Sequence, residues 1–176
     1  MRKAVFIALI MAATLLGAPA ALAESGAAAA ETPEGALIAA VNGERAGAGL
    51  SALVPEARLA CAARAHARDL AASGRFSHTG SDGGDLVARL ARAGYPYRMA
   101  AENLALAGAS ADEVVRLWRA SPGHNRNMRA GEARAAGAAR ERAPDGRYVW
   151  VIVFAAERPG IGGNAPFSTE CRGKMG

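Results

Sequence analysis

The chain has 176 residues, of which 51% are apolar and 21% charged, and its formal net charge is +5 at pH 7. This length suits one ordinary domain and is too short for two well-packed ones. The mild charge comes without a block of Lys and Arg interleaved with aromatics, so a nucleic-acid-binding protein is not predicted.

The first 23 residues have the pattern of a secretory signal peptide. Arg2 and Lys3 form a positive n-region, residues 4–16 are an almost unbroken apolar run, and Ala21-Leu22-Ala23 supplies the small residues that a signal peptidase reads. The run is shorter than the roughly 20 apolar residues of a membrane anchor. We therefore expect a secreted or periplasmic chain that begins near Glu24, carries a net charge of +3 and has no transmembrane anchor.

The remainder divides into a leader, one domain and a tail. Residues 24–33 contain nothing large to bury and are expected to form a flexible leader. Residues 34–158 are expected to fold as the domain, and residues 159–176 form a Gly/Pro-rich tail. Cys61 falls in a predicted helix and Cys171 in the tail. In an exported chain a disulfide between them is favoured, with a buried thiol at Cys61 and a loose one at Cys171 as the alternative.

Helical periodicity occupies most of the domain, and two large side chains lie on its apolar faces. His66 lies on the apolar stripe of the second expected helix and is interpreted as a core histidine rather than a ligand. Trp118 lies with Val114 and Leu117 on the apolar side of the fourth expected helix and is also interpreted as a core residue. The expected helices are residues 33–46, 55–74 and 84–93, one that a capping box at Ser110 and Glu113 opens, and residues 123–128.

Residues 147–156 (RYVWVIVFAA) give the strongest strand signal. Both alternating sets of side chains are apolar, so this strand requires cover on both faces. Pro144-Asp145-Gly146 is a turn signal that pairs it with a weaker, Ala-rich strand around residues 135–141. Helices first and a hairpin last predict an α+β fold, a three-layer α-β-α sandwich with a small antiparallel sheet between helices.

Three short segments place His, Glu and Asn in otherwise bland surroundings: FSHT, AENL and SPGHNRNM. His78 follows the end of a helix and His124 lies in the first turn of one, positions from which a side chain reaches a cleft. Together with Glu102 they would suffice to hold a zinc ion with one open position, or to act as a metal-free acid–base pair. Taken alone, each is more often a helix cap or a solvated side chain.

The order FSHTG, AENLA, W-x-x-SPGHNRNM and YVWVIVFA resembles the bacterial branch of the CAP superfamily (cysteine-rich secretory proteins, antigen 5 and pathogenesis-related 1) from about Leu37 to Phe154. The resemblance implies an α-β-α sandwich whose central cavity holds two His and two Glu. It matches His78, Glu102 and His124 to three of these. The fourth falls at a serine, Ser121, so the resemblance leaves a His-Glu-His cluster and argues against a four-ligand metal site.

The two asparagines in these motifs are interpreted as structural. Asn103 is expected to hold the turn beside Glu102 through hydrogen bonds to the backbone. Asn127 is expected to tie the helix that follows His124 to its neighbour.

These residues and the resemblance leave several functions open. The favoured one is a monomeric, non-enzymatic binding module whose His-Glu-His cleft takes a metal, a lipid or a cell-envelope glycan or peptide. The alternative is a hydrolase in which zinc or another divalent metal, held by His78, Glu102 and His124, activates water. A serine hydrolase built on Ser77 or Ser121 is disfavoured, because neither lies in a G-x-S-x-G elbow. A third interpretation is a structural envelope protein in which the side chains of the His-Glu-His cluster only meet one another's hydrogen-bonding needs.

Overall fold

The computed structural model describes residues 32–160. The predicted signal peptide, most of the leader and of the tail, and Cys171 lie outside these residues, so the disulfide stays a prediction. Within residues 32–160, none of the helices combines the length and the apolar character that crossing a bilayer requires. The elements in chain order are α2 (Pro33–Gly47), β1 (Val54–Pro55), α3 (Ala57–Ser73), α4 (Leu86–Arg92), β2 (Tyr97–Ala107), α5 (Ala111–Ala120), α6 (Pro122–Met128), β3 (Ala135–Arg142) and β4 (Tyr148–Glu157).

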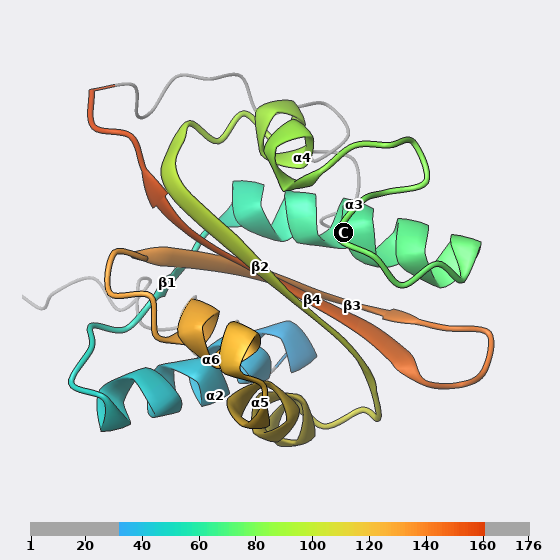
Figure 1. Cartoon of the computed structure of the whole chain (residues 1–176), viewed down its shortest axis with the longest axis horizontal. Coiled ribbons are helices and arrows are strands. Elements are labelled where there is room, and N and C mark those ends of the chain that lie inside the picture. Colours follow the sequence, from blue (N-terminus) through green and yellow to red (C-terminus); the bar gives the residue numbers. More distant parts are fainter. Residues whose placement is uncertain (1–31, 161–176) are drawn as a thin grey trace, which may run out of the picture.

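The strands form one sheet in the order β1-β3-β4-β2. Strands β3 and β4 are antiparallel, as are β4 and β2, whereas the two-residue β1 runs parallel to β3. Gly146 has φ +87° in the turn between β3 and β4, a conformation that favours glycine. Helices α3 and α4 lie on one side of the sheet and α2, α5 and α6 on the other (Figure 1), which confirms the predicted three-layer sandwich.

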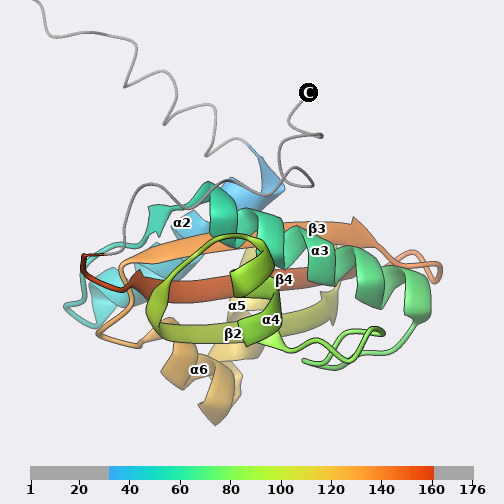
Figure 2. The ribbon, with the colours of Figure 1, turned by 90° about the horizontal axis from the view of Figure 1, so that it is seen from above.

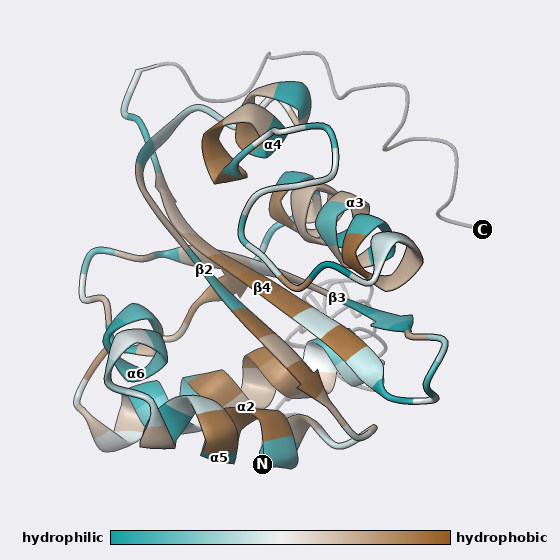
Figure 3. Cartoon of the chain, turned by 45° about the vertical axis from the view of Figure 1, so that its right-hand side comes forward, coloured by the Kyte–Doolittle hydropathy of each residue, from teal (hydrophilic) through white to brown (hydrophobic). Residues whose placement is uncertain are grey.

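Strand β4 contributes to two hydrophobic cores, one on each face of the sheet. Its even-numbered side chains from Trp150 to Phe154 pack with α2, α5 and α6. Its odd-numbered side chains from Val149 to Ala155 pack with α3 and the residues after it. Figure 3 shows β4 as hydrophobic along most of its length. The prediction that this strand needs cover on both faces is confirmed.

Helix α3 approaches β3 so closely that small residues are needed on the face of β3 that meets this helix. A Cβ atom on Gly137 would lie 2.0 Å from the backbone nitrogen of Ala60 and 2.1 Å from the carbonyl carbon of Leu59, so only glycine fits. Ala139, two residues further along and on the same face of β3, is also buried in the core beneath α3. The weak strand signal of this segment follows from this packing, because alanine and glycine are poor strand formers.

Three details differ from the expectations. Strand β2, with 11 residues, was not predicted, and it places Glu102 and Asn103 in a strand rather than a turn. Helix α3 begins two residues late because Pro55 belongs to β1 and the Glu56 side chain caps the helix. Leu117 is 51% exposed, since the buried stripe of α5 is Val114, Val115 and Trp118.

Strand β2 lies at an edge of the sheet, with α6 beside it (Figure 2). Side chains from α5 and α6 bond two carbonyls of this strand. The indole nitrogen of Trp118 donates to the carbonyl of Leu104 at 2.9 Å. The amide of Asn127 donates to the carbonyl of Glu102 at 3.3 Å. The two helices are therefore fastened to the strand that carries the candidate site, and Trp118 is buried as predicted.

Candidate functional site

Glu102 is the centre of the candidate site. Its residue is only 6% exposed, and it projects from the middle of β2. The guanidinium of Arg89 donates from Nη2 to both carboxylate oxygens, at 3.0 and 2.8 Å. Nδ1 of His78 lies 2.9 Å from Oε1, and Nε2 of His66 lies 3.7 Å from the same oxygen. The buried negative charge is thus compensated by one fixed cation and by an imidazole hydrogen bond.

The loop that carries His78 is anchored at several points. Helix α3 ends at Gly74, whose φ of +68° turns the chain out of the helix. Nε2 of His66 lies 2.9 Å from the Ser77 carbonyl, and Arg89 donates to the carbonyl of His78 itself at 3.3 Å. Further along, the Asp69 carboxylate accepts from the backbone N–H of Ser81 at 2.8 Å and from its hydroxyl. The position of the His78 backbone is therefore set by α3 and α4.

The contact with Glu102 fixes the tautomer of neutral His78. A carboxylate bonded in this way only accepts, so Nδ1 carries the proton and Nε2 keeps its lone pair. The side chain of His78 is 60% exposed. This exposed imidazole is therefore held in one orientation, with Nε2 left as a hydrogen-bond acceptor.

His124 lies in the first turn of α6 and is held from β2. Asn103 donates to the His124 carbonyl at 3.0 Å, and Asn127 donates to the side-chain oxygen of Asn103 at 2.9 Å. The imidazole lies against the Trp118 ring, with centroids 6.3 Å apart. Burial lowers the pKa of His124, and the charge of nearby His78 lowers it further. His124 is therefore a neutral imidazole at pH 7. Asn127 ties α6 to β2, whereas Asn103 was expected to hold a turn beside Glu102 and instead reaches from β2 to the backbone of α6.

A zinc site built from His78, Glu102 and His124 does not fit this arrangement. Within residues 32–160, no three His, Cys, Asp or Glu side chains lie close enough together to hold a metal ion. Both oxygens of Glu102 are bonded to the guanidinium of Arg89, which occupies the place that a metal cation would take. Glu102 is arranged to orient an imidazole, the role that carboxylates have behind histidine ligands and catalytic histidines.

Two residues add to the site that the sequence suggested. His66 is buried, as predicted, at 1% exposure, yet it also faces Glu102. Burial lowers the pKa of His66, although the Glu102 carboxylate opposes this effect. Arg89 was not singled out. A signal for it exists, because its spacing from Leu86 and Ala93 places this charged residue on the apolar face of its helix.

The other residues considered for catalysis lie in ordinary surroundings. The Ser77 hydroxyl accepts from the N–H of Thr79 at 3.1 Å, and Ser121 precedes α6 without a side-chain cap. Across residues 32–160, neither serine hydroxyl is hydrogen-bonded to a histidine.

Comparison with known proteins places this geometry in context. The sequence model of the cysteine-rich secretory protein (CAP) family matches residues 38–154. The chain is 32% identical over 87 residues to the uncharacterized protein YkwD of Bacillus subtilis, covering 49% of this chain and 34% of that protein.

The fold of the chain is similar to that of an extracellular protein containing a SCP domain from Bacillus anthracis, with a TM-score of 0.65, 22% identity, and coverage of 71% of this chain and 40% of that one. It is also similar to an outer surface protein from Borrelia burgdorferi, with a TM-score of 0.67, 21% identity, and coverage of 73% and 96%. The chain thus spans about a third of the length of the Bacillus subtilis relative.

Proposed function

Because the chain belongs to the cysteine-rich secretory protein (CAP) family, we propose that it is an extracytoplasmic binding module whose cleft meets its ligand through His78 and His124. Two structural neighbours described as an extracellular and an outer surface protein support the location. The signal-peptide pattern of residues 1–23 supports it independently.

One observation carries this proposal: Glu102 is fully engaged. Its two oxygens receive Arg89 and His78, so the carboxylate is not free to bind a metal or to take a proton from water. The groups left to meet a ligand are the exposed imidazole of His78 and the neutral imidazole of His124. Because the Nδ1 proton of His78 is donated to Glu102, His78 leaves Nε2 as an acceptor, whereas the neutral imidazole of His124 offers one donor and one acceptor. This set suits the hydroxyl and amide groups of a cell-envelope glycan or peptide. A hydrolase is less well supported, because it would need a free base or an activated serine.

The proposal is tested by co-sedimentation of the exported chain, residues 24–176, with isolated peptidoglycan sacculi. We expect the wild type to sediment with the sacculi and the His78→Ala/His124→Ala variant to lose at least about 80% of that binding, since two polar contacts of roughly 1 kcal/mol each are removed. Arg116→Ala removes an exposed cation from α5 and is the control for non-specific charge attraction. Equal binding by the histidine variant would contradict the proposal.

Calorimetric titration with zinc separates the binding module from the metal hydrolase. Two imidazoles without a carboxylate should bind zinc weakly, and the double histidine variant should not bind it at all. Tight one-to-one binding that Glu102→Gln abolishes would show that Glu102 leaves Arg89 to complete a three-ligand site. That result would favour the hydrolase.

A further inference from the structure

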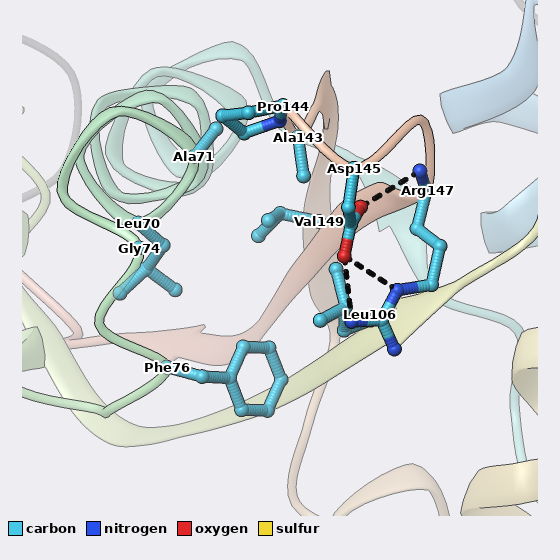
Figure 4. Close-up of a pocket in the computed structure, with 10 residues that line it drawn as sticks. All are labelled: Leu70, Ala71, Gly74, Phe76, Leu106, Ala143, Pro144, Asp145, Arg147 and Val149. Carbon is cyan, nitrogen blue, oxygen red and sulfur yellow. Dashed lines mark hydrogen bonds and ion pairs between the residues drawn. The ribbon is translucent and has the colours of Figure 1, made fainter.

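A hollow that neither His78 nor His124 lines lies where the end of α3 faces the β3–β4 turn (Figure 4). Its volume is about 230 Å³. Most of its wall is apolar, and Phe76, which is 51% exposed, forms one side of it opposite the turn. Its lining includes Gly74, Phe76, Leu106, Asp145, Arg147 and Val149.

The size of the hollow limits its occupant to one group. Pockets for drug-sized ligands have volumes of roughly 300–1,000 Å³, whereas a cavity of about 150 Å³ already accepts benzene. A hollow of about 230 Å³ therefore suits a single ring or a branched aliphatic group. The exposed ring of Phe76 favours an aromatic occupant, because aromatic pairs gain about 0.5–1.5 kcal/mol beyond the burial of their area.

The charges at the rim favour a neutral ligand. The guanidinium of Arg147 is bonded to the Asp145 carboxylate at 2.8 and 2.7 Å, and the Arg147 N–H donates to the same side chain at 3.0 Å. Because the Arg147 guanidinium and the Asp145 carboxylate neutralise each other, this pair offers no free counter-charge to a fatty acid or an amine. The pair still offers donors and acceptors to the amide groups of a peptide.

The hollow is linked to the candidate cleft along two segments of the chain. Phe76 precedes His78 by two residues in the anchored loop. Leu106 follows Glu102 by four residues and, because side chains alternate along a strand, faces the same side of β2. Four strand residues span about 13 Å, a distance that an extended peptide of about four residues covers.

From these observations we propose that the hollow beside Phe76 binds an aromatic side chain of an uncharged peptide segment. The hollow itself does not depend on the proposed function of the cleft. Only the idea that one peptide reaches both sites rests on it.

The test is a nuclear magnetic resonance titration of ¹⁵N-labelled exported chain with N-acetylphenylalaninamide. We expect saturable shifts at the amides of Gly74, Leu106 and Val149. N-acetylserinamide, which lacks the ring, should bind about tenfold more weakly. Phe76→Ser should weaken binding of the aromatic probe about fivefold. Val87→Ser is the matched control, because Val87 is an exposed apolar residue, at 49%, that does not line the hollow.

Several results would overturn the proposal. Shifts that do not saturate, or equal effects of Phe76→Ser and Val87→Ser, would show that no aromatic site exists here. Tighter binding of octanoate than of the aromatic amide would identify a lipid chain as the occupant. Shifts at Gly74 and Val149 that grow with protein concentration alone would identify a second copy of the chain. In the His78→Ala/His124→Ala variant the aromatic probe should still bind, so a failed cleft and a failed hollow remain distinguishable.

Discussion

Two arginines are buried in the described domain, and the groups that accept hydrogen bonds from them differ. Arg45, at the end of α2, is fully buried and donates to the carbonyls of Ser51, Met128 and Ala130 at 2.8–2.9 Å. Arg89, at the end of α4, is 5% exposed and also bonds carbonyl groups, but its principal partner is the carboxylate of Glu102.

The difference distinguishes a purely structural contact from one within the candidate functional site. The carbonyls around Arg45 belong to the segment after α2, to the last residue of α6 and to the segment that follows α6, so this guanidinium holds stretches of chain together. Arg89 holds a charge whose other neighbour is an exposed imidazole. A buried cation that meets only backbone fixes shape, whereas one that meets a carboxylate also fixes the chemistry of whatever that carboxylate contacts.

The largest effect is expected from Arg89→Leu. This change leaves the Glu102 carboxylate buried without its fixed counter-charge and should lower the free energy of unfolding by about 3–5 kcal/mol. Urea denaturation at pH 7, followed by circular dichroism, measures it.

A second substitution sharpens the result. Arg89→Leu/Glu102→Leu removes both charges, so most of the lost stability should return, because buried ion pairs are often replaced by apolar residues at little cost. No recovery in the double variant would mean that the contacts of Arg89 with the carbonyls of His78 and Gly84, rather than with Glu102, dominate its effect.

Arg45→Leu is expected to have a somewhat smaller effect, about 3 kcal/mol. The loss comes from several buried carbonyls left without donors, each costing roughly 1–3 kcal/mol before the surroundings relax. The same urea titration measures the change. Unlike the loss in Arg89→Leu, this loss should not be recovered by a second substitution, because Arg45 bonds several backbone carbonyls and no single side chain whose removal would restore stability. A loss below about 1 kcal/mol would show that water reaches these carbonyls.

The smallest effect is expected from the titration of His66. Burial lowers its pKa in the folded state below the ordinary value of 6.5, so below that value the unfolded chain binds more protons than the folded one. Stability should therefore be complete above about pH 6.5 and should fall as the pH drops to the folded-state pKa of His66. His66→Gln keeps a donor for the Ser77 carbonyl and removes the titration. Unfolding at pH 5, 6 and 7 should show a flatter dependence in this variant, and an unchanged slope would assign the effect to other groups.

The fold was largely predictable where a local pattern decides the structure. The two apolar faces of β4 and the capping residue Ser110 each act within a few neighbouring residues, and both predictions are confirmed. Strand β2 was missed because its sequence, YRMAAENLALA, has polar residues at its centre and alanines that favour helices. Its strand structure is imposed by ten paired positions along β4.

The candidate site was partly predictable for a similar reason. His78, Glu102 and His124 stood out because each is a reactive residue among inert neighbours. The role of Glu102 was not visible, since it depends on Arg89, which approaches from another helix. An arginine in the last turn of a helix normally suggests a solvated surface, and only its spacing with Leu86 and Ala93 hinted otherwise.

The covered edge of β2 limits the ways in which a partner chain can attach. An open strand edge recruits other chains by extending the sheet, whether as a bound peptide or as an aggregate. Here the carbonyls of Glu102 and Leu104 are already taken by Asn127 and Trp118. A visiting peptide therefore cannot become a fifth strand at this edge without displacing those side chains. Along this stretch of β2 a peptide has to be recognised by its side groups, and the same two bonds oppose edge-to-edge pairing of two copies of the domain here.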